Sequence, residues 1–240
     1  MRIDAYFTAA EVDPAVVDGS TVVVVDVVRA TTTIVEALAN GARGIYPTAS
    51  TEEAVKLAAS LGREDTLLCG ERRGRKVEGF DLGNSPREFT REAVGGKRLV
   101  MSTTNGTRAF GVGQEGVRLL ACAFTNLGAV ALEVAGDEGL VVLCAGREEH
   151  FAIDDALCAG HLIKRVMEAA SGTHGLNDAA LAARALAGSR KPTRAFLSQS
   201  AGGRALVAIG LGGDLDLCAE VDRHHVVAEM RDQAIILSGK

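Results

Sequence analysis

Charged side chains interrupt an apolar run near the amino terminus. Four valines, Val22–Val25, are followed by Asp26, two more valines, Arg29 and then Thr31–Thr33. Burying an unpaired carboxylate or guanidinium costs several kcal/mol. The stretch therefore indicates one of two arrangements. Either Asp26 and Arg29 form a structural ion pair, or they belong to a site that uses both charges to hold a cation and an anion together.

A second polar stretch has the composition of an anion-binding loop. It gathers hydroxyls, an amide, a glycine and an arginine within seven residues, namely Ser102, Thr103, Thr104, Asn105, Gly106, Thr107 and Arg108. Hydroxyls and backbone N–H groups at a helix start suit phosphate, and glycine lets the backbone approach closely. Helix capping is the alternative, but it accounts for only one or two of these residues. We therefore expect residues 103–107 to bind substrate.

Three arginines, Arg29, Arg108 and Arg147, each follow an expected strand. The planar fork of arginine binds phosphate, sulfonate or carboxylate through two parallel hydrogen bonds. A single arginine of this kind is more often part of a surface salt bridge. Three at three strand exits favour a shared anion site, so all three are candidate catalytic residues together with Asp26.

Acidic side chains lie in the same kind of position. They are Asp26, Glu71, Asp81, Asp154 and Asp155. Oxygen ligands suit Mg²⁺, which uses one or two carboxylates together with substrate phosphate and water. The chain has no cysteine and histidine spacing typical of zinc. The structural alternatives are acids at a helix start for Asp154 and Asp155 and an ion-pair partner of Arg29 for Asp26.

A different phosphatase chemistry is suggested by Cys69 and Arg75, which match the Cys-x5-Arg pattern of thiol phosphatases. In those enzymes a thiolate attacks phosphorus while the loop binds the phosphate oxygens. The pattern is short, no histidine precedes Cys69, and no Ser or Thr follows Arg75. A Cys69-dependent mechanism is therefore kept as an alternative.

Strand-like and helix-like stretches alternate along the chain. The expected strands are Thr21–Val28, Gly44–Pro47, Thr66–Cys69, Arg98–Ser102, Val117–Ala121 and Leu140–Cys144. The expected helices are Thr32–Asn40, Glu52–Leu61, Pro86–Ala93, Thr107–Val112, Leu127–Ala135 and Ile153–Ala170. This order predicts an α/β fold of three layers, with mainly parallel sheets covered by helices on both faces. Ligands in such folds bind at the carboxyl ends of the strands, where the polar stretches lie.

The two halves of the chain resemble each other at an offset of 74 or 75 residues. Gly41–Arg43 matches Gly116–Arg118, Thr51 matches Thr125, and Leu67–Arg72 resembles Val142–Arg147. The constant offset favours an internal duplication, although all strand–helix–strand units look alike. We expect related α/β subdomains at 1–96 and 97–170. Residues 171–240 would add a helical segment (Asn177–Ala187, Thr193–Gln199 and Arg204–Ile209) and a final strand, Ala234–Leu237, packed on the same domain.

Bulk properties exclude several classes of protein. The 240 residues are 47% hydrophobic, with 28 glycines and a formal net charge of −5, and no basic stripe for nucleic acid is present. No apolar run has the length of a membrane span, and the charged amino terminus does not resemble a signal peptide. The five cysteines form no Cys-x-x-Cys pair. We expect a cytoplasmic protein with reduced cysteines.

Long motifs in the chain resemble the 2-phosphosulfolactate phosphatase family. They are Asp26–Ile34, Gly70–Pro86, Thr103–Ala109 and Cys144–Gly160, with a weaker match at Ser200–Leu206. The resemblance implies an α/β fold with two related subdomains and a Mg²⁺-dependent acid phosphatase. Such an enzyme would release phosphate from 2-phospho-3-sulfolactate in coenzyme M biosynthesis. Another small phospho-hydroxy acid is the alternative substrate, and a non-catalytic anion-binding protein is the alternative function.

The resemblance also assigns residues. Asn84 joins the substrate-binding set, and Asp26, Asp155 and Glu71 are the expected Mg²⁺ ligands. Asp154 stands where the family is expected to have Glu, so it is the less secure ligand. The expected partner is a small phosphorylated, sulfonated or carboxylated substrate, and a homodimer is a further expectation. Attack by water and attack by Asp26 to form a phosphoenzyme both remain open.

Overall fold

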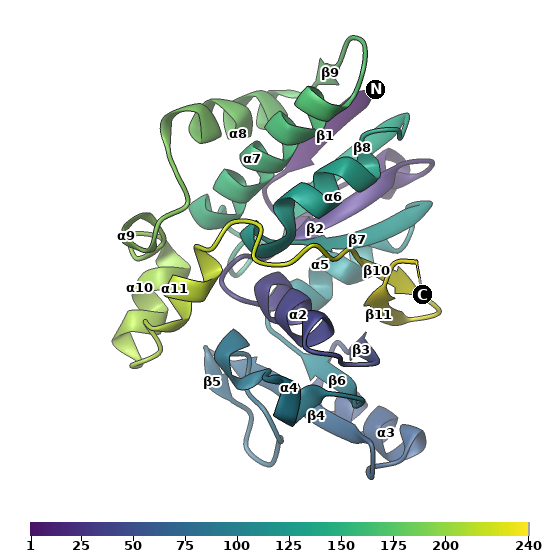
Figure 1. Cartoon of the computed structure of the whole chain (residues 1–240), viewed down its shortest axis with the longest axis vertical. Coiled ribbons are helices and arrows are strands. Elements are labelled where there is room, and N and C mark those ends of the chain that lie inside the picture. Colours follow the sequence, from purple (N-terminus) through teal and green to yellow (C-terminus); the bar gives the residue numbers. More distant parts are fainter. Residues whose placement is uncertain (240) are drawn as a thin grey trace.

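The computed structural model describes residues 1–239 and shows helices on both faces of one mixed β-sheet (Figure 1). The order across the sheet is β5-β4-β6-β3-β11-β10-β7-β2-β8-β1-β9. The strands are β1 (Arg2–Tyr6), β2 (Thr21–Val25), β3 (Gly44–Pro47), β4 (Thr66–Arg72), β5 (Arg75–Lys76), β6 (Arg98–Ser102), β7 (Arg118–Cys122), β8 (Gly139–Cys144), β9 (Gly175–Leu176), β10 (Ala228–Arg231) and β11 (Ala234–Leu237). The predicted α/β class is confirmed, although the strands form one sheet.

The helices connect these strands. They are α1 (Pro14–Val17), α2 (Ala30–Ala39), α3 (Thr51–Leu61), α4 (Arg91–Val94), α5 (Gly106–Gly113), α6 (Leu127–Val134), α7 (Ile153–Ala169), α8 (Asp178–Ser189), α9 (Arg194–Leu197), α10 (Ala201–Ala208) and α11 (Asp214–Cys218), with short 3₁₀ turns at Ala9–Glu11, Pro86–Glu88 and Phe124–Asn126. Within the described residues no helix combines the length and apolarity needed to cross a membrane.

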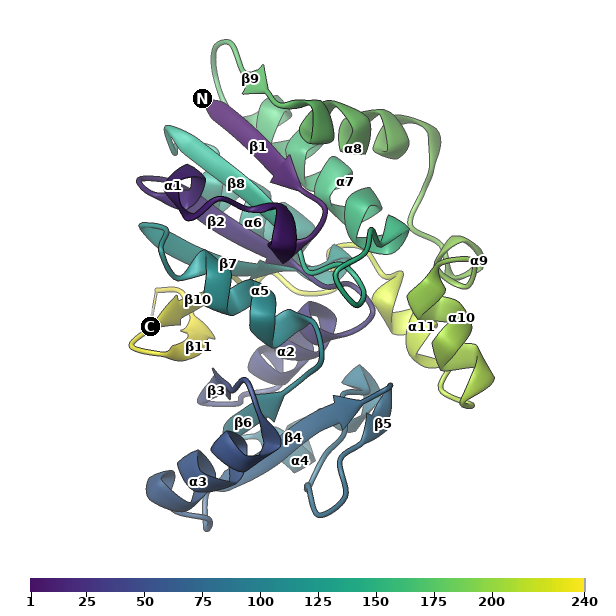
Figure 2. The same cartoon turned by 180° about the vertical axis from the view of Figure 1, so that it is seen from behind.

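The valines of β2 show how the layers form. All four are fully buried, and successive side chains of a strand point to opposite faces of the sheet. Val23 and Val25 pack into the core beneath α6, α7 and α8, whereas Val22 and Val24 pack into the core beneath α2 and α5. Figure 1 shows α6, α7 and α8 on one face of this half of the sheet, and Figure 2 shows α1 and α5 on the other.

The sheet order reads symmetrically about the β10–β11 hairpin. On one side β6 lies between β4 and β3 and runs parallel to both, and on the other β2 lies between β8 and β7 and runs parallel to both. Strand β2, from residues 1–96, is therefore paired with two strands from residues 97–170, and β6, from residues 97–170, is paired with two strands from residues 1–96. This exchange does not conflict with an internal duplication, which stays a prediction, as do the subdomain boundaries.

The exchange brings the two halves' strand ends together. In Figure 2, β1 and β4, which lie on opposite sides of the β10–β11 hairpin in the sheet, both point toward the side of the molecule that carries α10 and α11. The helices cross over in the same way, because α5 packs on β2 and α2 packs on β7. Loops that follow β2, β4, β6 and β8 can therefore meet at one place.

Several predicted elements differ from the structure. The expected helix Pro86–Ala93 is a 3₁₀ turn followed by α4, because the Thr90 side chain caps a new helix by accepting from the Ala93 N–H. Strands β1 and β10 and helix α11 were not predicted. Ser50 caps α3, because its hydroxyl accepts from the Glu53 N–H at 3.1 Å, whereas Ser85 makes no side-chain cap.

Candidate active site

A small pocket lies where the carboxyl ends of β2, β4, β6 and β8 face α10. Its volume is about 70 Å³, enough for a few water molecules or a small anion. The lining residues are Asp26, Val28, Arg29, Glu71, Arg73, Gly74, Asn84, Thr103, Thr104, Asn105, Arg147, Glu148, Gly202, Ala205, Leu206 and Ile209. One wall is polar and belongs to the strand ends, and the opposite wall is the apolar face of α10. The polar stretches that follow β2, β4, β6 and β8 therefore all contribute residues to one pocket.

Asp26 directly follows β2 and is 7% exposed. Its Oδ1 accepts a hydrogen bond from the Ala30 N–H at 3.1 Å, at the start of α2. Burial raises the pKa of Asp26 to about 7; the Ala30 N–H opposes this shift, and the nearby Asp154 and Glu71 charges add to it. Asp26 is therefore a carboxyl group that can exchange a proton near neutral pH.

Arg29 lies beside Asp26 in the pocket but pairs with another acid. Its Nη1 is 2.8 Å from Asp214 Oδ2, and its Nη2 donates to the carbonyl of Gly74 at 2.8 Å. The ion-pair partner of Arg29 is thus Asp214, from α11, and not Asp26. The structural interpretation of Asp26 that the sequence left open does not hold, because its proposed partner is already engaged.

Residues 103–105 join β6 to α5, which begins at Gly106. Thr103 and Thr107 are tied together, since the Thr103 N–H donates to Thr107 Oγ1 at 3.1 Å and the Thr107 N–H donates to Thr103 Oγ1 at 3.2 Å. A Cβ at Gly106 would lie 2.6 Å from the Ala30 Cβ, so the starts of α2 and α5 touch. Two helix amino termini, each with a positive dipole end, therefore lie at one pocket.

Glu71 organises two loops around the pocket. Its Oε1 accepts from both the N–H and the hydroxyl of Thr104 at 2.9 Å, and its Oε2 accepts from the Gly74 N–H at 2.7 Å. Both carboxylate oxygens are thus used within the protein. They hold the exposed Thr104 and the β4–β5 turn against the pocket.

The two adjacent acids of α7 have different surroundings. Asp155 Oδ1 accepts from the Val27 N–H at 2.8 Å and its Oδ2 from the Gly146 N–H at 3.1 Å, so it fastens the loop after β2 to the loop after β8. Burial raises the pKa of Asp155, and the charges of Asp154 and Asp26 raise it further. Asp154 is 3% exposed, and in the described part of the chain its Oδ1 has no hydrogen-bond partner. Burial raises the pKa of Asp154 to about 6.

The expected metal ligands do not form a three-carboxylate cluster. Among residues 1–239, no three His, Cys, Asp or Glu side chains are grouped so that they could hold a metal ion. A magnesium site with one or two protein carboxylates does not require such a cluster. The roles of Asp26, Asp155 and Glu71 as ligands stay a prediction.

The three arginines do not all reach the pocket. Arg147 lines it together with Arg29, and within the described residues its guanidinium has no ion-pair partner. Arg108, on α5, lines a neighbouring hollow that shares Thr104, Asn105 and Glu148 with the pocket, and it pairs there with Glu149. Its side chain is 59% exposed. The structure thus places two of the expected arginines at the site and the third outside it.

Comparison with known proteins assigns the chain to a family. A family model described as 2-phosphosulpholactate phosphatase matches residues 6–233. The chain belongs to this family. A relative from Thermotoga petrophila, named probable 2-phosphosulfolactate phosphatase, is 37% identical over 92% of this chain and 93% of its own. A relative of the same name from Clostridium acetobutylicum is 34% identical over 98% of this chain and 100% of its own.

The substrate in the family name is a phosphoric monoester, so this is a family of phosphoric monoester hydrolases. The resemblance found in the sequence is confirmed over nearly the whole chain. A phosphatase of this kind acts on a small phosphorylated compound, which agrees with the small volume of the pocket.

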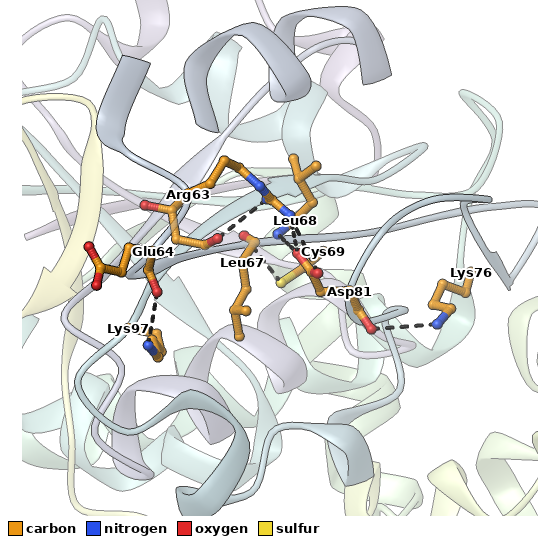
Figure 3. A network of polar contacts seen from close by, with 9 residues as sticks. Arg63, Glu64, Leu67, Leu68, Cys69, Lys76, Asp81 and Lys97 are labelled. Atoms are coloured by element: carbon orange, nitrogen blue, oxygen red, sulfur yellow. Dashed lines mark hydrogen bonds and ion pairs between the residues drawn. The ribbon is translucent and has the colours of Figure 1, made fainter. Parts of the chain in front are cut away.

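Structural roles explain other residues that the sequence singled out. Cys69 is fully buried within β4, its Sγ faces the carbonyl of Leu67 at 3.8 Å, and burial raises the pKa of its thiol (Figure 3). It does not line the pocket, so a thiolate nucleophile at Cys69 lacks a structural basis. Asp81 accepts from the Leu68 N–H at 2.7 Å and pairs with Arg63, which fixes the loop beside β4.

Residues from the carboxyl-terminal segment complete the pocket, and the sequence did not assign them a role in the site. Gly202, Ala205, Leu206 and Ile209 form its apolar wall, and Asp214 holds Arg29. The weak family match at Ser200–Leu206 was the feature of the sequence that could have indicated this apolar wall. Asn84 was expected on the resemblance, and it is buried in the lining with its Oδ1 unpartnered in the described chain.

Proposed function

We propose that the protein hydrolyses 2-phospho-3-sulfolactate, or a similar small phospho-hydroxy acid, to the hydroxy acid and phosphate with the help of Mg²⁺. The names of the relatives support the substrate. The pocket supports the reaction class, because it joins anion-binding groups to a carboxyl group that titrates near neutral pH. A place in coenzyme M biosynthesis would follow if the sulfonated compound is the best substrate.

The observation that carries the proposal is the meeting of the α2 and α5 starts at Asp26. A Cβ at Gly106 would lie 2.9 Å from Asp26 Oδ2, so this carboxylate oxygen faces the first turn of α5. Helix amino termini and arginine forks bind phosphate. A phosphate bound there would lie within reach of Arg29, Arg147 and the carboxyl group of Asp26.

Each wall of the pocket has a task in this proposal. Arg147 and Arg29 bind the phosphate oxygens and stabilise the charge that develops as the ester bond breaks. The apolar wall formed by Leu206 and Ile209 excludes bulk water and so strengthens these charge interactions. Glu71 keeps Thr104 in place at the pocket rim.

The donors present fit a magnesium ion with few protein ligands. Among the described residues, Asp154 Oδ1 is a buried oxygen without a hydrogen-bond partner, and the charge of Asp154 helps to raise the pKa of Asp26. Asp26 and Asp154 would therefore hold the ion, while both oxygens of Asp155 and of Glu71 already accept hydrogen bonds. Bound Mg²⁺ supplies Lewis acidity toward the phosphate.

Two courses of reaction use Asp26 differently. In the first, Asp26 takes a proton from a water molecule that attacks phosphorus. In the second, Asp26 itself attacks, and water then hydrolyses the phosphoenzyme. In both, the P–O ester bond breaks and the leaving oxygen takes up a proton from water, so that the hydroxy acid is released. Acid quenching during turnover of a ³²P-labelled substrate separates them, because only the second course leaves label on the protein.

A non-catalytic anion-binding protein is the competing function. It would use Arg29, Arg147 and the helix starts but would have no need of a buried acid at Asp26. The decisive experiment is a phosphate-release screen over small phospho-hydroxy acids, with Mg²⁺ and with EDTA. Release that requires Mg²⁺ supports the proposal, whereas binding without release from any compound would favour the competing function.

A further inference from the structure

A buried ion pair connects the carboxyl-terminal segment to the pocket. The Arg29 and Asp214 side chains are each 3% exposed, with Nη1 and Oδ2 2.8 Å apart. The second oxygen of Asp214 accepts from the Ser85 hydroxyl at 2.7 Å. On the other side, the carbonyl of Gly74 accepts from Arg29 Nη2 at 2.8 Å. Two segments far from Arg29 in the sequence thus hold its guanidinium, and Ser85 in turn holds Asp214.

We propose that Asp214 is a positioning residue of the active site, which orients Arg29 for the phosphate of the substrate. The inference rests on the proposed function, because it assigns Arg29 a phosphate to bind. Asp214 does not line the pocket itself, whereas Arg29 does. Any effect of Asp214 on the reaction must therefore act through the position of Arg29.

The hydrogen bonds of the Arg29 guanidinium show how Asp214 can orient it. A guanidinium has five N–H donors in a rigid plane. Asp214 and Gly74 take one each, from different nitrogens, which fixes the plane and leaves three donors for a ligand. A side chain fixed in this way loses little freedom when it binds phosphate, and misplacement of such a group by an ångström lowers catalytic rates strongly.

The alternative is that the pair only fastens α11 to the start of α2. A purely structural pair would affect folding but would leave the phosphate affinity of the folded protein unchanged. The chain offers a matched control in Asp216, which lies on the same helix but pairs with Arg194 at 3.5 Å and is 57% exposed. Replacing Asp216 by Asn removes an acid from α11 without changing the contacts of Arg29.

The test compares Asp214→Asn, Arg29→Gln, the double variant and Asp216→Asn. For each, kcat and KM are measured with the best substrate of the screen, and the dissociation constant of inorganic phosphate is measured by calorimetry. Asp214→Asn should lower kcat/KM and weaken phosphate binding by roughly tenfold or more. Asp216→Asn should match the wild type in both.

The double variant gives the decisive comparison. If Asp214 acts through Arg29, adding Asp214→Asn to Arg29→Gln should change kcat/KM by less than about threefold. If the two residues act independently, the fold-losses in kcat/KM of the single variants should multiply in the double variant. Removing both charges also avoids an uncompensated buried charge, so this comparison holds even if Asp214→Asn alone folds poorly.

Two results would overturn the inference. One is a folded Asp214→Asn variant with wild-type phosphate affinity, and the other is a double variant whose losses multiply. Absence of phosphate release by the wild type would count against the proposed function alone, because the phosphate affinities of the variants still decide the role of Asp214. A wild type that binds no phosphate would contradict both.

Discussion

The backbone of Gly106 lies against the carboxylate of Asp26, so that a Cβ at position 106 would be 2.9 Å from Asp26 Oδ2 and 2.6 Å from the Ala30 Cβ. Both distances are shorter than ordinary contacts. The first turns of α2 and α5 can therefore meet only because residue 106 has no side chain. The contact couples the fold to the site, since the same glycine sets the distance between the two helix starts and the position of Asp26.

Replacing Gly106 by Ala should therefore disturb both stability and activity. Forcing a methyl group into this contact should lower the free energy of unfolding by about 1–3 kcal/mol. It should also lower kcat/KM by about tenfold or more, because Asp26 or the α5 start must move. Thermal melts and phosphate-release assays measure the two effects.

Gly111 provides the control for this prediction. It lies on the same helix, and a Cβ there would meet nothing within 4 Å. Gly111→Ala should keep wild-type kinetics and gain stability from the higher helix propensity of alanine, by about 0.5–1 kcal/mol. Equal losses in both variants would show that the effect at Gly106 comes from the helix as a whole.

The raised pKa of Asp26 predicts how the stability of the metal-free protein depends on pH. The folded-state pKa of about 7 exceeds the ordinary value of 3.8 for this carboxyl group because the group is buried. The unfolded chain therefore loses this proton first, and the stability of the folded state falls as pH rises from about 4 to about 7. Asp26→Asn removes the contribution of Asp26 to this dependence, while those of Asp154 and Asp155 remain, and should be more stable than the wild type at pH 8 by about 2–4 kcal/mol.

Denaturant titrations in EDTA at pH 5 and pH 8 measure this difference. Asp26→Asn should also lose the stabilisation that Mg²⁺ gives the wild type, because an ion that binds only the folded state adds to its stability. A variant that is less stable than the wild type at pH 8 in EDTA, with its response to Mg²⁺ intact, would remove Asp26 from the metal site.

The sequence predicted the residues of the polar wall better than their roles. Asp26, Arg29 and Arg147 were recognisable because each follows an apolar strand, and the carboxyl ends of parallel strands lie at one edge. The ion-pair partner of Arg29 could not be recognised from the sequence, because Asp214 lies 185 residues away and no local pattern links the two. Strand β10 was missed for a similar reason. Its segment Ala228–Arg231 is half polar, and only pairing with β7 and β11 makes it part of the sheet.

Adjacent carboxylates show a finer limit of sequence reasoning. Asp154 and Asp155 are both in the first turn of α7, and nothing in their spacing says which one faces backbone N–H groups. The family pattern favoured Asp155 as the metal ligand. The structure shows that Asp155 joins two loops, whereas Oδ1 of Asp154 has no hydrogen-bond partner among residues 1–239. The orientation of each side chain depends on packing across the whole sheet.

These two acids should therefore respond oppositely to replacement by Asn. In Asp155→Asn, the amide NH₂ faces the Val27 or the Gly146 N–H, so one buried donor loses its acceptor at a cost of about 1–3 kcal/mol. That variant should keep its Mg²⁺-dependent rise in Tm. Asp154→Asn should be at least as stable as the wild type in EDTA, because burial also raises the pKa of Asp154, and it should lose that rise. Melts with and without Mg²⁺ decide between them, and the reverse pattern would return Asp155 to the metal site.

The positions of Arg147 and Arg108 predict unequal roles for the two arginines. Arg147 lines the pocket, whereas Arg108 forms an exposed pair with Glu149, and exposed pairs contribute little to stability. Lysine keeps the charge of arginine but loses the two-pronged hydrogen bonding. Arg147→Lys should therefore lower kcat/KM by about tenfold or more, and Arg108→Lys should change it by less than about threefold.

Steady-state kinetics at low and high ionic strength test this contrast. Screening weakens interactions between exposed charges more than those in a partly buried pocket. Any effect of Arg108→Lys that comes from long-range attraction of an anionic substrate should therefore vanish in high salt, while the loss in Arg147→Lys should persist. If Arg108→Lys instead lost about tenfold at both ionic strengths, Arg108 would have to leave Glu149 and contact the substrate. The pocket would then extend into the neighbouring hollow lined by Thr104, Asn105 and Glu148.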